Sequence, residues 1–279
     1  MFLPARNQGN SMITIDSLGI DTLEISKNIT NFISKEVTKS GLTGAIIAAS
    51  GGIDSSLLLA LTVSALGPEH VRAITIPERD ITPESDITDV MRLTEQYNVT
   101  CDIVEITPTL TALSKALPLY DPSDLLATGN LRPRIRMMVS YHYANALNMM
   151  VIGSSNKTEL LTGYFTKYGD GGVDLMPLGD LYKCQIRQLA HHMGVPQEII
   201  EKTPTAGLWP GQTDEGDMGA SYDTIDLILW GRENGWSAQE IASEIAVDQS
   251  LVEKILTRVE KNEHKRHLPL ILRLGSLPS

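Results

Sequence analysis

The stretch "GAIIAASGGIDSSLLLALTVSAL" (44–66) decides the fold of this chain. Its first part, 44–50, is a short apolar run of the kind that forms a buried parallel strand. Glycines, an aspartate and hydroxyl residues follow, and 54–66 is predicted to be a helix with Asp54 or Ser55 near its cap. Small and hydroxyl residues between a strand and a helix are typical of phosphate binding. The lysine of the common G-x-x-x-x-G-K-[ST] loop is missing, so a different kind of loop is expected.

Apolar runs and helical patterns alternate beyond this stretch. Strands are predicted at 71–77, 100–106 and 149–155, and helices at 16–40, 83–98, 135–148, 157–165 and 178–194. This alternation predicts an α/β fold with a doubly wound parallel sheet flanked by helices. Ligands of such sheets bind beyond the carboxyl ends of the strands, where "SGGIDSS" (50–56) and "GSSNKTE" (153–159) both fall.

The chain is predicted to form one domain over residues 1–279. Residues 1–15 are expected to be a mobile N-terminal extension. The segment 204–221 is rich in glycine, proline and acidic residues, and it is expected to be a long, mobile active-site loop.

Composition excludes several classes of function. The formal net charge of −11 disfavours nucleic-acid binding, which needs a basic surface. Residues 237–266 resemble a helix-turn-helix, but the candidate recognition helix is acidic. Cys101 and Cys184 are expected to be reduced thiols, because no C-x-x-C pair occurs. No apolar stretch approaches the roughly 18 residues of a membrane span, and the N-terminus lacks a signal-peptide core. We therefore expect a cytoplasmic protein without membrane contact.

The residues of "SGGIDSS" suit an anion with a bound metal. The glycines let backbone N–H groups approach a phosphate closely, and Ser50, Ser55 and Ser56 offer further donors. Asp54 would repel a phosphate unless a cation such as Mg²⁺ lies between them. The alternative is that Asp54 only caps the helix and that the small residues only make a turn.

S-G-G-x-D-S after a buried strand resembles the pyrophosphatase loop of the N-type ATP pyrophosphatases. These enzymes have an adenine-nucleotide alpha-hydrolase-like fold and cleave ATP to AMP and pyrophosphate by adenylating an acceptor. They include NAD synthetases, GMP synthetases, asparagine synthetases and tRNA-thiolating enzymes. One departure is Ala48, which stands where the family often has glycine.

A longer stretch indicates one family among these. "KTELLTGYFTKYGDGGVDLMPLGDLYK" (157–183) closely resembles the signature of NAD synthetases, and 204–215 and 263–266 match that family in the same order. The resemblance implies a ligase for the last step of NAD biosynthesis, which converts deamido-NAD to NAD with ATP and ammonia. It also implies Mg²⁺ as cofactor and a homodimer with active sites at the interface.

The resemblance assigns roles to individual residues. By their chemistry and their positions after strands, Asp54 and Glu159 are also candidate Mg²⁺ ligands, and the alternative for Glu159 is a solvated acid at a helix start. Asp54, Lys183 and Asp170 would be catalytic, with Asp170 holding or deprotonating ammonia; the alternative for Asp170 is a structural role in a turn. The ATP site would comprise Ser50, Gly51, Gly52, Ile53, Asp54, Ser55, Ser56, Ser154, Lys183 and Thr205, and the deamido-NAD site would comprise Arg134, Lys167, Asp174, His264 and Lys265. The chemistry agrees, since expulsion of pyrophosphate needs cations and guanidinium groups suit a diphosphate.

Two alternatives stay open at this point. One is another adenylating amidotransferase, such as a GMP synthetase-like enzyme, and the other is a protein that binds a nucleotide without turning it over.

The sequence also gives an expectation for the nitrogen donor. Glutamine-using relatives carry a nitrilase-type domain before the synthetase part, whereas the ATP loop here begins near residue 50. Neither cysteine has a nucleophile setting, so free ammonia is expected as the donor.

Overall fold

The computed structural model describes residues 13–79 and 81–272. Its centre is a four-stranded parallel sheet in the order β3-β2-β1-β4. The strands are β1 (Ala45–Ala48), β2 (Val71–Thr75), β3 (Thr100–Ile103) and β4 (Met150–Ile152). In the central strand, Ala45 pairs with Val71 on one side and with Met150 on the other. The predicted doubly wound parallel sheet flanked by helices is confirmed.

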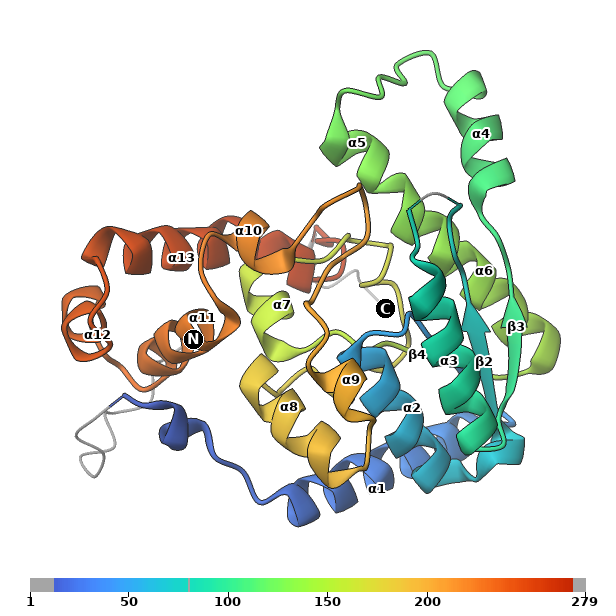
Figure 1. Cartoon of the computed structure of the whole chain (residues 1–279), viewed down its shortest axis with the longest axis horizontal. Coiled ribbons are helices and arrows are strands. Elements are labelled where there is room, and N and C mark those ends of the chain that lie inside the picture. Colours follow the sequence, from blue (N-terminus) through green and yellow to red (C-terminus); the bar gives the residue numbers. More distant parts are fainter. Residues whose placement is uncertain (1–12, 80, 273–279) are drawn as a thin grey trace, which may run out of the picture.

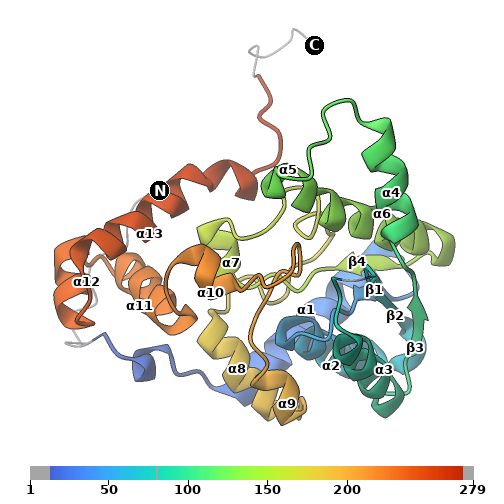
Figure 2. The ribbon, with the colours of Figure 1, turned by 45° about the horizontal axis from the view of Figure 1, so that its top comes forward.

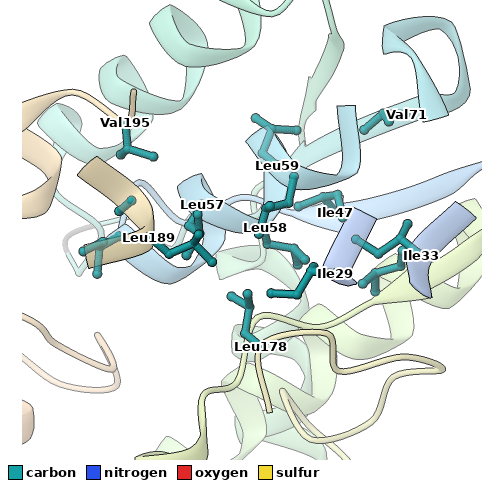
Figure 3. Packing of buried hydrophobic residues seen from close by; sticks show 14 of the residues in the cluster. Ile29, Ile33, Ile47, Leu57, Leu58, Leu59, Val71, Leu178, Leu189 and Val195 are labelled. Atoms are coloured by element: carbon teal, nitrogen blue, oxygen red, sulfur yellow. The ribbon is translucent and has the colours of Figure 1, made fainter. Parts of the chain in front are cut away.

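Alternate residues of the strands supply the two faces of the sheet. Ala45 and Ile47 point to a face covered by helices α1 (Thr22–Ser40), α2 (Ile53–Leu66) and α8 (Lys183–His192), with which they form the largest core cluster (Figure 3). Ile46 points to the opposite face, which packs against α6 (Leu131–Leu147) and α4 (Thr107–Ala116). The apolar runs are continuous rather than alternating because both faces are buried.

Helix α2 is buried around most of its circumference. Leu57, Leu58, Leu59 and Leu61 are all at most 1 % exposed, although they point in different directions around the helix. The helix that follows the glycine-rich loop is therefore embedded in the core, and it fixes one end of that loop.

A second, helical layer follows the sheet. Helices α11 (Tyr222–Glu233), α12 (Ala238–Glu244) and α13 (Gln249–Lys261) form their own core cluster and lie at the left of Figure 1, with α7 (Lys157–Thr162) and α8 between them and the sheet. Ile13 is buried in this cluster, and residues 1–12 of the predicted extension lie outside the described residues. The remaining helices are α3 (Glu84–Gln96), α5 (Leu125–Gly129), α9 (Gln197–Ile200), α10 (Asp214–Met218) and the short 3₁₀ helices η1 (Ile15–Leu18), η2 (Pro68–His70) and η3 (Glu263–Arg266).

Several predicted helix boundaries were wrong. The helix predicted from residue 16 begins at Thr22, because the side chain of Asp21 accepts a hydrogen bond from the backbone N–H of Glu24 (3.0 Å) and caps it there. The helix predicted at 157–165 ends at Thr162, because Gly163 adopts a left-handed conformation (φ 67°).

Other differences concern proline and loop segments. Helix α6 begins at Leu131 rather than 135, because Pro133 lies in the first turn, where a missing N–H costs no hydrogen bond. The helix predicted at 178–194 spans only Lys183–His192. The segment 204–221 contains the short helix α10, which Thr213 caps. No helix in the described part of the chain is both long and apolar enough to span a bilayer.

The topology places the candidate site. The chain leaves β1 toward β2 and β3 and later returns to β4 on the other side of β1, so the strand order switches between β1 and β4. Such a switch opens a crevice at the carboxyl ends of the two strands. The loops after β1 (49–52) and after β4 (153–156) therefore meet at this crevice.

Gly51 is required in the loop after β1 for two reasons. Its φ is +78°, which residues with a Cβ rarely adopt, and a Cβ there would lie 2.6 Å from the carbonyl oxygen of Asp86 at the start of α3. Gly52 differs, because its φ is −89° and a Cβ would meet only the Ser50 hydroxyl oxygen, at 3.5 Å.

These two glycines give a matched test of the loop. Gly51→Ala should lower the free energy of unfolding by about 2 kcal/mol, the sum of left-handed strain and displacement of α3. Gly52→Ala should change it by less than about 0.5 kcal/mol. Urea unfolding of both variants measures the difference. Equal losses in the two variants would contradict the assigned loop conformation.

Candidate active site

A buried lysine lies between two carboxylates at the crevice. Lys183, the first residue of α8, is only 2 % exposed. Its Nζ donates a hydrogen bond to Asp54 Oδ2 (2.5 Å) and lies 3.8 Å from Glu159 Oε1. Asp54 is in the first turn of α2 and Glu159 is in the first turn of α7. The structure thus brings together the three residues that the sequence assigned to metal binding and to catalysis of adenylation.

The protonation states of this cluster depend on one another. Burial alone would lower the pKa of Lys183, but the charges of Asp54 and Glu159 outweigh it and raise that pKa above its ordinary value. Burial and the nearby charge of Asp54 raise the pKa of Glu159 well above its ordinary value, although Lys183 opposes this. The cluster thus favours the ammonium form of Lys183, whereas the negative charge of Glu159 is insufficiently stabilised by its present neighbours.

Asn156 holds the two carboxylates in place. It is fully buried, and its Nδ2 donates to Asp54 Oδ1 (2.9 Å). Its Oδ1 accepts from the backbone N–H of Glu159 (3.0 Å), and Glu159 Oε2 accepts from the backbone N–H of Asn156 (3.2 Å). This reciprocal pair is a capping box, whose N-x-x-E pattern is readable in the sequence but was not assigned there.

A third carboxylate lies close to the cluster. Asp214 is 5 % exposed, and its Oδ2 accepts from the hydroxyl of Tyr222 (2.9 Å), whose ring centroid is 4.9 Å from Lys183 Nζ. Asp214 Oδ1 is buried without a hydrogen-bond partner, and burial raises the pKa of this carboxyl. Both residues were missed in the sequence, where Asp214 was only part of a loop match.

The donor set of the cluster fits Mg²⁺. The carboxyl groups of Asp54, Glu159 and Asp214 lie around the ammonium of Lys183, and a divalent cation would stabilise the ionised forms of Glu159 and Asp214, whose pKa values are raised. Within residues 13–79 and 81–272, no group of three or more His, Cys, Asp or Glu side chains could hold a metal ion by itself. Mg²⁺ characteristically takes one or two carboxylates and completes its shell with phosphate oxygens and water, and Asp54 and Glu159 suit this arrangement.

The loop after β1 is held by hydrogen bonds within the segment 50–55 and by a hydrogen bond from Lys202. Inside, Ser55 Oγ accepts from the backbone N–H of Ser50 (3.1 Å) and lies 3.1 Å from Ser50 Oγ. Outside, Lys202 Nζ donates to the carbonyl of Gly51 (3.1 Å) and to the carboxylates of Asp86 (2.9 Å) and Asp89 (2.5 Å). Lys202, which the sequence analysis missed, thus connects the loop, the start of α3 and the base of the segment 204–221.

Four of the residues predicted to bind deamido-NAD gather in one place. Lys167 Nζ donates to the carbonyl of His264 (2.5 Å), and Arg134 Nη2 donates to the carbonyl of Lys167 (3.5 Å). Lys265 Nζ donates to the carbonyls of Gly163 (2.7 Å) and Phe165 (2.9 Å), and burial lowers its pKa. The guanidinium of Arg134 is exposed and has only one long contact, so it is available to an anion.

The two neighbouring arginines of "LRPRIR" are structural. Arg132 forms a forked ion pair with the buried Glu78, and Arg136 donates through Nε to the carbonyl of Ile76 (3.0 Å). Both therefore hold the start of α6 against the end of β2, and Arg134 is the member of the three that faces solvent.

The remaining predicted residues lie on loops around the crevice. Asp170 Oδ1 accepts from the backbone N–H of Thr166 (2.8 Å), and the residue is exposed. Asp174 uses both carboxylate oxygens, which accept from the hydroxyl of Tyr141 (2.9 Å) and from the backbone N–H of Val151 (2.9 Å). Ser154 is the second residue after β4 and is half-buried, and Thr205 accepts from the backbone N–H of Gly207 (3.1 Å) in the exposed loop.

The chain is similar to known proteins over most of its length. The family model for NAD synthase matches residues 25–269. The curated NH(3)-dependent NAD(+) synthetase of Methanococcoides burtonii is 42 % identical over 258 residues, which are 92 % of this chain and 98 % of that protein.

Two solved structures have the same fold. The NMN synthetase of Francisella tularensis superposes with a TM-score of 0.81 at 33 % identity, over 92 % of this chain and all of that chain. The NH3-dependent NAD synthetase of Campylobacter jejuni gives a TM-score of 0.77 at 32 % identity, over 91 % of this chain and all of that chain. With its crevice, its carboxylate-bound lysine and these matches over nearly its whole length, the chain belongs to the NAD synthase family.

Proposed function

We propose that this protein converts deamido-NAD to NAD by ATP-dependent adenylation of the nicotinate carboxylate, followed by amidation with ammonia. The observation that carries this proposal is the buried ammonium of Lys183 between Asp54 and Glu159 at the switch point of the sheet. A fixed, desolvated cation at a phosphate-binding crevice stabilises the charge of a departing pyrophosphate. The curated relatives, which are about 40 % identical over most of the chain, bear the corresponding name.

In the first step, a carboxylate oxygen of deamido-NAD attacks the α-phosphorus of ATP. The bond between the α-phosphorus and the bridging oxygen to the β-phosphate breaks, and pyrophosphate leaves with the electron pair. The backbone of the loop around Gly51 and Gly52 would bind the phosphates, and Lys183 would face the leaving oxygens. Mg²⁺ bound by Asp54 and Glu159 would neutralise further phosphate charge when present.

In the second step, the lone pair of neutral ammonia attacks the acyl carbon of the adenylate. The bond from this carbon to the phosphate oxygen breaks, AMP leaves and the amide loses a proton. Asp170, exposed on the loop that follows Lys167, is proposed to accept that proton or to hold the incoming ammonium. The segment 204–221 is proposed to close over the adenylate and exclude water, and Thr205 and Ser154 are proposed to contact ATP.

We also propose a homodimer. Between α4 and the middle of α6, the chain exposes several large apolar side chains (Leu117, Leu119, Leu125, Leu126 and Met138). These come from segments that lie next to one another in Figure 2. A second copy of the chain would cover such a surface.

The cytoplasmic location of the protein stays a prediction.

A full assay of the reaction tests the function. The purified chain should form NAD, AMP and pyrophosphate in equal amounts from ATP, Mg²⁺, deamido-NAD and ammonium chloride. Glutamine freed of ammonia should not replace ammonium. A parallel reaction with nicotinate mononucleotide tests whether this chain instead makes NMN, the product named for the Francisella tularensis relative. ATP binding without pyrophosphate release would establish the non-catalytic alternative, and preference for the mononucleotide would replace the proposed substrate.

Asp54→Asn should reduce pyrophosphate release by at least about 100-fold. The amide keeps the shape of the side chain and an acceptor for Lys183, but it loses the charge that would bind Mg²⁺. The matched control is Asp180→Asn, because the Asp180 side chain is 97 % exposed. Pyrophosphate release is measured over a Mg²⁺ titration, together with thermal melting. Turnover near that of the control would refute the metal role of Asp54.

Arg134→Ala should weaken the binding of deamido-NAD but not the binding of ATP. Loss of a charge-assisted contact costs about 1.5–3 kcal/mol, which corresponds to an increase of roughly 10- to 100-fold in the Michaelis constant for deamido-NAD. Arg232→Ala, at another exposed arginine, serves as control. Steady-state kinetics with each substrate varied in turn measures both constants. An equal rise for ATP would contradict the assignment.

A further inference from the structure

Helix α11 presents three polar side chains to the starts of α7 and α8. Tyr222, Asp226 and Glu233 are spaced by four and seven residues, which places them on one face of the helix. In both ribbon views α11 lies beside α7 and α8 (Figures 1 and 2). This face of α11 therefore packs against the first turns of α7 and α8, which carry Glu159 and Lys183.

Glu233 contacts the first residue of α7 and the residue that precedes α8. Its Oε2 accepts from Lys157 Nζ (2.8 Å) and from the hydroxyl of Tyr182 (2.6 Å). Since Glu233 is at the end of α11, this contact fixes the distance between the two helix starts at the outer edge of the cluster.

Asp226 makes the inner contact and is fully buried. Its Oδ1 accepts from Thr158 Oγ1 (2.5 Å), and its Oδ2 accepts from the backbone N–H of Cys184 (2.8 Å). Thr158 Oγ1 in turn accepts from the backbone N–H of Lys183 (3.0 Å). A chain of hydrogen bonds thus runs from the backbone of Lys183 through Thr158 to Asp226.

The direction of this chain is fixed by its backbone donors. The N–H groups of Lys183 and Cys184 can only donate, so Thr158 Oγ1 accepts from Lys183 and Asp226 Oδ2 accepts from Cys184. Burial raises the pKa of Asp226 to about 6, and the donors of its hydrogen bonds oppose this rise. The single hydroxyl proton of Thr158 must point to Asp226, which leaves its lone pairs for the N–H of Lys183. The first N–H groups of a helix have no hydrogen-bond acceptor within the helix. Thr158 and Asp226 provide acceptors for the first two N–H groups of α8, those of Lys183 and Cys184.

We propose that Asp226 is a positioning residue for adenylation. Together with Thr158, it fixes the backbone from which Lys183 reaches the departing pyrophosphate, and Thr158 directly precedes Glu159. This role rests on the proposed function, because it concerns the step that expels pyrophosphate. Asp226 touches neither substrate and acts only through the position of Lys183.

Thr158 allows a test with conservative variants. Thr158→Val keeps the shape but removes both hydrogen bonds, Thr158→Ser keeps the hydroxyl, and Asp226→Asn keeps the shape of the acceptor without its charge. Thr94→Val is the matched control, because Thr94 is equally buried (1 % exposed) and donates to the carbonyl of Val90 (2.9 Å), remote from Lys183. Each variant is assayed for kcat, for both Michaelis constants, for melting temperature and for hydrogen exchange of the Lys183 and Cys184 amides.

Thr158→Val should lower kcat on the order of 10- to 100-fold with little change in either Michaelis constant, since a misplaced catalytic group costs about that much. It should also speed exchange of the Lys183 amide. Thr158→Ser should restore both quantities, Asp226→Asn should resemble Thr158→Val, and Thr94→Val should lose stability but not kcat.

Two results would overturn the proposal. One is unchanged exchange at Lys183 in Thr158→Val, and the other is a kcat that stays at the wild-type value or falls equally in Thr94→Val. If the wild-type chain makes no NAD, the proposed function fails instead, and the exchange data still decide whether Thr158 and Asp226 hold the start of α8.

Discussion

The need to stabilise one buried ammonium group shapes the arrangement of this protein. An ammonium transferred out of water without partners would cost far more than the whole stability of the fold. Lys183 is therefore surrounded by Asp54 and Glu159, with the ring of Tyr222 below it. These residues come from α2, α7 and α11, so the same charge joins the sheet layer to the C-terminal helices. Because the surrounding groups are already oriented, little reorganisation remains when phosphate charge develops.

Most of the sheet could be predicted from the sequence because its signal is local. Short apolar runs, each followed by glycine, hydroxyl or amide residues, predict buried parallel strands whose carboxyl ends carry the site. The loop with Gly51 and Asp54 was recognised for the same reason, since its chemistry is contained within seven consecutive residues. Resemblance to a family then identified Glu159 and Lys183, which the structure places beside Asp54.

The residues that hold this cluster could not be predicted, because their partners are far away in the sequence. Lys202 contacts the carbonyl of Gly51, and Asp226 contacts the start of α8, and no local pattern encodes either contact. Asp226 left one weak signal, an acidic residue among the apolar residues of its helix. Two helix boundaries were misplaced because hydrophobic periodicity does not show where a helix is capped: Asp21 caps the start of α1, and the left-handed Gly163 ends α7.

The distance along the chain between Asp54 and Tyr222 has a consequence for biosynthesis. The glycine-rich loop and its helix are synthesised before Lys183, whereas the aromatic ring that lies under Lys183 is synthesised after it. A chain synthesised only as far as Lys183 therefore contains the glycine-rich loop and the lysine without the ring that lies under it. The cluster around Lys183 can therefore be complete only after the chain has been synthesised as far as Tyr222.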